Sequence, residues 1–307
     1  MPEKAEVRHT LSELQARQLA NVTKTVPMMT EITPRWLVPF LQWVPVEAGT
    51  YRVNKVTPAP PGTRTIECSP GQEIDLPEIY VDYEEKPREY TLCAVTTVLD
   101  LQTRISDMYR SPHDQIKEQL RLIIEKVKER QESELINNSG YGLLHNVDSS
   151  MHLKTRKGPP TPDDLDELLA KVWKEPSFFL AHPRAISAFG RECTRRGVPP
   201  PTVNIFGTPF ITWRGIPLVP SDKLAVKSEK TSILLVRTGE KKQGVVGLFQ
   251  PGIPGEVSPS LSVRFMGINH RAVASYLISL YCSLAVLTED ALGVLDGVTV
   301  DQYHEYK

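Results

Sequence analysis

The stretch Glu73-Ile74-Asp75-Leu76-Pro77-Glu78-Ile79-Tyr80-Val81-Asp82-Tyr83 decides how the chain is organised, because apolar and charged residues alternate on both sides of a proline. Such alternation is typical of a half-buried β-strand. Large aliphatic residues are few in the surrounding residues 50–90, and ten of the 26 prolines fall between Lys24 and Tyr90. Proline is confined to sheet edges and turns. We therefore interpret residues 50–90 as an extended hairpin loop that pairs with another subunit, preceded by an N-terminal arm over residues 1–49.

The composition predicts a soluble, cytoplasmic protein without a transmembrane segment. Of the 307 residues, 40% are hydrophobic and 24% are charged, which is a globular composition. A formal net charge of −1 gives no electrostatic reason to expect nucleic acid as a partner. The start, Met1–Glu6, is polar and lacks a signal-peptide core, and the apolar run 272–287 is too short to span a bilayer.

A long helix is predicted over about 112–138. Ser111-Pro112-His113-Asp114 combines an N-cap serine, a proline at the first helical position and a carboxylate in the first turn. Apolar residues then recur at helical spacing between charged ones until Asn137–Gly140 ends the pattern. At 1.5 Å per residue this helix is about 39 Å long. Its narrow apolar stripe predicts that one face packs on a sheet while the other faces solvent or another subunit.

The second half of the chain predicts a compact mixture of helices and strands. Thr161 caps one helix, and a second helix runs from Pro183 to Arg196. Strands are predicted at residues 91–101, 178–181, 210–213, 217–220, 233–237, 244–249 and 261–268. The run 272–287 fits helical spacing as well, but its alternate residues form an unbroken apolar set with serines opposite, which favours a long strand. The fold class predicted is α+β.

The sequence predicts no catalytic residues, no bound cofactor and no metal ligands. Phosphate-binding, dinucleotide-binding, nucleophile-elbow and zinc-protease motifs do not occur in it. The four cysteines form no Cys-x-x-Cys pair, so neither a zinc site nor a redox motif is encoded. The densest polar cluster contains His145, Asp148 and His152, which could hold a metal or build a base and nucleophile pair. We interpret it as a polar loop after the long helix.

Two short stretches resemble the phage-capsid (HK97-like) fold that tailed-phage shells and bacterial encapsulins share. Asn138–Leu144 resembles the Gly-Leu-Leu turn with which that fold leaves its long spine helix. Phe206–Pro220 resembles a strand pair of its axial domain. The resemblance implies a peripheral domain with the spine helix at residues 91–160, a mainly axial domain at 161–258, and C-terminal strands at 259–307 that return to the peripheral domain.

The amino-acid sequences of Glu78–Asp107 and Ser111–Ser150 are similar to those of family 2A encapsulins, whose members include mycobacterial antigens. This resemblance runs along essentially the whole chain. It implies a shell protein, not an enzyme, that self-assembles into a closed icosahedral nanocompartment, expected to have 60 subunits. The implied cargo is a cysteine desulfurase, so pyridoxal phosphate is expected only in that enzyme. Such large particles would also co-sediment with membranes.

Two other functions compete with this interpretation. A phage or prophage major capsid protein shares the fold, but the near-zero net charge is better suited to storing protein than packed DNA. A hydrolase or metal enzyme centred on His145, Asp148 and His152 is the alternative from another class.

The loop from Arg195 to Thr202 is the candidate lining of a pore. It follows the helix of the axial domain, and Pro199-Pro200-Pro201 holds it extended. In the resembling fold the axial domain points at the symmetry axes, so symmetry would repeat Arg195 and Arg196 as a positive ring. An ordinary solvated helix end is the competing interpretation of the two arginines.

Overall fold

The computed structural model describes residues 14, 32–46, 49–54, 83, 85–101, 115–270 and 273–303, and contains two sheets, one short ribbon and their helices. The first sheet has six strands in the order β1-β11-β14-β13-β12, with β4 paired to β14. Its strands are β1 (Gln42–Pro45), β4 (Cys93–Leu101), β11 (Val245–Phe249), β12 (Glu256–Ser258), β13 (Leu261–Ile268) and β14 (Ala274–Val286).

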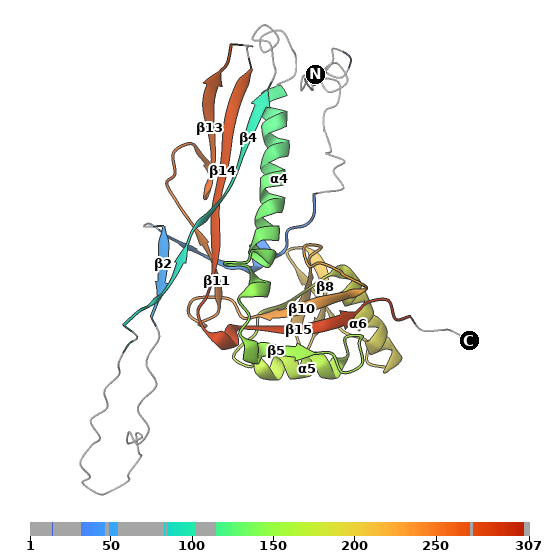
Figure 1. Ribbon diagram of the computed structural model, residues 1–307. Helices are drawn as coiled ribbons and strands as arrows, with labels where there is room; N and C mark the ends of the chain where they lie inside the picture. The colour runs from blue at the N-terminus through green and yellow to red at the C-terminus, as the bar shows by residue number, and fades with distance from the viewer. Residues whose placement is uncertain are drawn as a thin grey trace, which may run out of the picture.

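Helix α4 (Gln115–Asn137) lies along the first sheet, with its axis close to the direction of β4 and β14 (Figure 1). Val127 is buried from the helix side, and Ile278 and Leu280 of β14 are buried from the sheet side. Charged residues separate the apolar ones along α4, so only a narrow stripe packs on this sheet, while Leu135 and Ile136 near the helix end are buried in the main core. Within the described residues, no helix is long and apolar enough to cross a membrane.

The second sheet has seven strands in the order β5-β15-β10-β6-β9-β8-β7, and it lies across one end of α4 (Figure 1). Its strands are β5 (His152–Lys154), β6 (Phe178–Ala181), β7 (Thr202–Ile205), β8 (Thr208–Trp213), β9 (Ile216–Pro220), β10 (Lys230–Val236) and β15 (Leu292–Thr299). Helices α5 (Pro162–Lys171) and α6 (Pro183–Arg195) pack on it through Leu165, Leu168 and Phe189. The short 3₁₀ turns are η1 (Leu143–His145), η2 (Ser149–Met151) and η3 (Glu289–Ala291).

Most predicted elements are confirmed, including the long strand β14 and the cap of α5 at Thr161, which together with Asp164 forms a capping box. Residues 259–303 contribute strands to both sheets: β13 and β14 belong to the first sheet, along which α4 lies, and β15 belongs to the second. That strand pairs with β10 and β5 in the second sheet. The predicted cap of the long helix at Ser111–Asp114 lies outside the described residues.

The segment before the ribbon, residues 32–46, lies on the body of the protein and helps to cover it. It contains a short helix, α2 (Leu37–Phe40), and β1, which pairs in parallel with β11 of the first sheet. Phe40 packs its ring against those of Phe178 and Phe210, at centroid distances of 5.2 Å and 5.7 Å, and so reaches the second sheet. This segment therefore joins the two sheets.

Candidate assembly surfaces and functional residues

A two-stranded ribbon carries the candidate hairpin loop. Strands β2 (Thr50–Val53) and β3 (Arg88–Thr91) pair in antiparallel register and belong to neither of the large sheets (Figure 1). Two tyrosines anchor the ribbon: the hydroxyl of Tyr90 donates to the carbonyl of Val286 at 2.7 Å, and that of Tyr51 donates to Glu240 at 2.7 Å. Burial together with the bond to Glu240 raises the pKa of Tyr51 to about 12. The rest of the predicted hairpin, residues 55–82, lies outside the described residues.

An apolar groove of about 660 Å³ runs between the segment 33–43, the middle of α4 and the first sheet. Trp36, Trp43 and Tyr281 supply aromatic surface, and Arg35 and Lys128 lie among the lining residues. The indole of Trp43 donates to the carbonyl of Val38 at 2.9 Å, which fixes its orientation. Such a groove can take several apolar side chains.

A polar junction joins α4 to the turn Ser221–Lys223, which follows β9 of the second sheet. Lys223 Nζ lies 2.8 Å from Glu129 Oε2 and 2.9 Å from Asp222 Oδ1. Burial alone would raise the pKa of Glu129, but the bonds from Lys223 and Thr33 hold it below its usual range. Glu132, one turn further along α4, is buried and lies 2.9 Å from Ser221 Oγ. Both carboxylates therefore belong to the contact between α4 and the second sheet.

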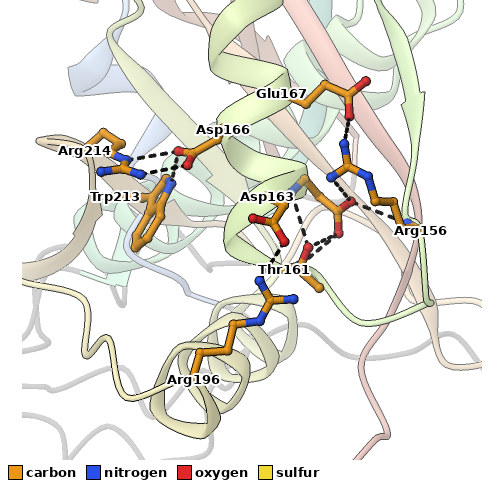
Figure 2. A network of polar contacts seen from close by, with 9 residues as sticks. Arg156, Thr161, Asp163, Asp166, Glu167, Arg196, Trp213 and Arg214 are labelled. Carbon is orange, nitrogen blue, oxygen red and sulfur yellow. Dashed lines mark hydrogen bonds and ion pairs between the residues drawn. The ribbon is translucent and has the colours of Figure 1, made fainter.

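The candidate pore arginines have different surroundings, although they are neighbours in sequence. Arg196 leaves the end of α6 and reaches Asp163 in the first turn of α5, with an N–O distance of 2.7 Å (Figure 2). Arg195 lies 3.8 Å from Glu192 on its own helix, and 59% of its side chain is exposed. Arg196 is thus committed to holding α5 and α6 together, while Arg195 is the more available cation.

The acidic start of α5 is neutralised from several elements. Arg214 forms two hydrogen bonds to Asp166, whose Oδ1 also accepts from the indole of Trp213 at 2.7 Å (Figure 2). The bond from Arg214 holds the pKa of Asp166 below its usual range. Arg156 contacts Asp164 and Glu167 on the opposite side of the helix. These pairs fix α5 on the second sheet and leave no unpaired acidic cluster there within the described residues.

The polar cluster His145, Asp148 and His152 does not form a site. His152 Nδ1 lies 2.7 Å from Asp296 Oδ2 on β15, and not against Asp148. Asp148 caps η2 by accepting from the backbone N–H and the hydroxyl of Ser150. Ser232 donates to the other oxygen of Asp296 at 2.9 Å, so its hydroxyl points at the carboxylate and not at the imidazole. The described residues contain no group of three or more metal-binding side chains.

The described cysteines are buried or half-buried thiols. Cys93 and Cys282 are register partners on β4 and β14. Burial raises the pKa of Cys282 to about 12 and that of Cys193 to about 11. Thiols with raised pKa values are poor nucleophiles at neutral pH, because the thiolate is the reactive form. These cysteines are therefore structural.

Comparison with known proteins gives a consistent result along nearly the whole chain. The family described as "Type 2A encapsulin shell protein SrpI-like" matches residues 56–302. The type 2A encapsulin shell protein SrpI of Synechococcus elongatus is 66% identical over 297 residues, which cover 97% of this chain and 96% of the relative. A type 2A encapsulin shell protein of Mycobacterium leprae is 62% identical over 97% of both chains.

Solved structures agree with these relatives. A cryo-EM structure of the holo-SrpI encapsulin complex from Synechococcus elongatus superposes with a TM-score of 0.84 at 63% identity, covering 97% of this chain and 99% of the other. The capsid of a native GTA particle superposes with a TM-score of 0.58 at 13% identity, covering 95% of this chain and 96% of the other. That second likeness shows the fold alone. The predicted α+β, HK97-like capsid fold is confirmed.

Proposed function

Because the chain belongs to the SrpI-like family of type 2A encapsulin shell proteins, we propose that it assembles with copies of itself into a closed icosahedral nanocompartment of 60 subunits. The chain is a structural shell protein and not an enzyme. The observation that carries the proposed assembly is the ribbon β2–β3, which pairs with neither large sheet and is held to the body by side chains such as Tyr51, Tyr90 and Arg88. An isolated two-stranded ribbon is at best marginally stable, so pairing with a neighbour would complete it.

The protein expressed alone is expected to form hollow particles of uniform size. Closed shells need heterologous contacts around symmetry axes, and interlocking arms supply interface area that compact bodies lack. Negative-stain images and light scattering at micromolar concentration measure this directly. A monomer or dimer under these conditions would contradict the proposal.

We further propose that the enclosed cargo is a cysteine desulfurase and that the compartment lies in the cytoplasm. The support is the resemblance to family 2A encapsulins and a near-zero net charge, which does not favour packed nucleic acid. The contents of particles purified from the source cells distinguish an encapsulin from a viral capsid. A yellow pyridoxal-phosphate enzyme inside supports the encapsulin, and nucleic acid inside supports a capsid of viral origin.

We also propose that Arg195 contributes to a positive ring at an opening in the shell, where it would favour small anions. Arg195→Glu is expected to slow an encapsulated enzyme about tenfold at low ionic strength and limiting anionic substrate, because symmetry repeats the change around the opening. The free enzyme, measured alongside, should be unaffected. Arg196 is a poorer choice for substitution, since a glutamate there would face Asp163 and disturb the contact between α5 and α6.

Arg184→Glu is the matched control for this pore experiment. Arg184 lies at the opposite end of α6 and pairs with Glu229, so the substitution changes the charge of the subunit equally at another place. It should leave encapsulated turnover within about a factor of two. If Arg195→Glu also leaves turnover unchanged at low ionic strength, Arg195 does not line the opening.

A further inference from the structure

Glu132 is a buried carboxyl group at the junction between α4 and the second sheet. Its residue is 1% exposed, and its Oε1 lies 2.9 Å from Ser221 Oγ in the turn that follows β9. Its Oε2 is buried and has no hydrogen-bond partner in the part of the chain that the structure describes. An ionised carboxylate in such a place is costly, because burial removes the water that would solvate it and nothing replaces that water.

The cations nearest to Glu132 are bonded to other carboxylates. Lys223, in the turn, is shared between Glu129 and Asp222. Arg35, in the segment before α2, is directed at Glu125 and Glu129. Both of these cations therefore already have anionic partners other than Glu132.

These surroundings favour the protonated form of Glu132. Burial raises the pKa of Glu132 to about 7, and the nearby Glu129 and Asp222 add to the rise. The bond with Ser221 and the charge of Lys223 act in the opposite direction and are outweighed. A protonated carboxyl needs no cation, and the Ser221 hydroxyl can donate to it or accept from it.

We propose that Glu132 is a proton-operated latch that closes the junction between α4 and the turn Ser221–Lys223. With the proton bound, the two surfaces pack dry against each other. Without it, the carboxylate draws water into the junction, and α4 and the turn separate locally. The latch lies within one chain, so it operates whether or not that chain forms a shell. In a shell it would set how firmly the second sheet is held to the long helix.

The direction of the pH effect follows from the two pKa values. The open junction has the ordinary value of 4.5 and the closed junction has about 7, so the closed form binds more protons between these values. Opening therefore becomes more favourable as the pH rises from 4.5 to 7, by at most about 300-fold, and changes no further above 7. Glu129, whose pKa is lowered, contributes fully above 4.5, and Lys223, whose pKa is raised, contributes fully below 10.5. Neither masks the effect of Glu132.

Hydrogen exchange of the intact protein tests the latch. In the wild type, amide protection at residues 129–137 and 221–224, corrected for the intrinsic pH dependence of exchange, is expected to fall between about pH 5 and about pH 7.5. The expected fall is more than tenfold. Glu132→Gln is neutral at every pH and can still bond Ser221, so its protection should stay high and flat. Glu134→Gln is the control, because that carboxylate has partners in Arg130 and Asn138; it should follow the wild type.

Two results would overturn the latch. One is wild-type protection that does not change over this range; the other is a Glu132→Gln variant that loses protection as the wild type does. If the variant fails to fold, infrared spectroscopy of the wild type decides. A protonated-carboxyl stretch should disappear with a midpoint near pH 7, and its absence at about pH 6 contradicts the proposal. Both readouts are local to the junction, so a failure of shell assembly does not affect them.

Discussion

A chain in which residues 54–87 are replaced by Asn-Gly is expected to fold and to form no closed particles. Val53 and Arg88 are register partners at the end of the ribbon, so a two-residue turn can join them directly. Asn-Gly adopts the type I′ turn, whose twist matches that of antiparallel strands. The variant thus keeps β2 and β3 and removes only the hairpin that we propose to pair with neighbouring subunits.

The body of the protein should tolerate this replacement. The anchors of the ribbon, Tyr51 and Tyr90, are retained, and the described core clusters are formed by residues outside the exchanged segment. Its unfolding temperature should lie within about 4 °C of that of dissociated wild-type subunits. Light scattering and negative stain report closure, and near-ultraviolet circular dichroism reports packing.

Deletion of Met1–Thr10 is the comparison for the hairpin replacement. Most of these residues are polar and they lie at the end of the chain, so we expect particles to close without them. Normal shells from the hairpin replacement would show that residues 54–87 decorate the surface and do not hold it together.

Sequence patterns predicted those parts of the fold in which local and tertiary preferences agree. The alternation along 272–287 has the period of a strand, and β14 lies between β11 and β13 in the first sheet with β4 also paired to it. Thr161 and Asp164 have the spacing of a capping box, and both bonds of that box are formed. In both cases the local sequence alone is enough to determine the structure that it forms.

Other elements depend on neighbours that are distant in sequence. The strand β15 contains Gly293, Asp296 and Gly297, which is a loop-like composition. A Cβ atom at Gly293 would lie 2.9 Å from side-chain atoms of Leu168 and Val172, so glycine is what lets α5 approach this strand. Likewise, Gly247 of β11 leaves room for the ring of Trp43. Composition alone could not distinguish a packing glycine from a turn glycine.

The partners of the polar residues at the junctions of the fold also could not be predicted from the sequence. His152 is hydrogen-bonded to Asp296, which lies 144 positions away in the sequence. Glu132 is hydrogen-bonded to Ser221, 89 positions away. Clustering in the sequence suggested His145 and Asp148 as partners of His152, but each of the three residues lies in a different local turn or strand. No local signal marks Glu132 among the many charged residues of its helix.

Arg237 is buried where two of the chain's crossings between the two sheets meet. It follows β10 where the chain leaves the second sheet for β11, and it contacts the return connection between β14 and β15. Its Nη2 lies 2.7 Å from Asp290 Oδ1 and 2.7 Å from Thr288 Oγ1, and 1% of its side chain is exposed. The bond from Arg237 holds the pKa of Asp290 far below its usual range. One guanidinium thus fastens two connections.

Arg237→Ala is expected to destabilise the folded subunit by about 3 kcal/mol, the lower end of the range for a broken buried ion pair, because Asp290 is 28% exposed. Arg237→Lys should recover only part of this loss, because an ammonium group cannot reproduce the forked contact with Asp290 and Thr288. In both variants Asp290 keeps an ion pair with Lys174, whose Nζ lies 2.9 Å from Asp290 Oδ2, and this limits the loss of stability. Guanidinium unfolding of dissociated subunits at a fixed incubation time measures the differences.

Arg184→Ala is the surface control with which the losses of stability of the Arg237 variants are compared. Arg184 pairs with Glu229 at the surface, with 45% and 47% of the two side chains exposed, and such pairs contribute about 0–1 kcal/mol.

The contribution of the Arg237–Asp290 pair to stability depends on pH. Because the pKa of Asp290 is lowered in the folded protein, the stabilisation from its carboxylate is complete above the unfolded value of 3.8 and is lost as the pH falls below it. The difference between wild type and Arg237→Ala should therefore be constant from pH 5 upwards and shrink in stronger acid. A loss for Arg237→Ala no larger than that for Arg184→Ala would mean that the crossings are held by backbone pairing alone.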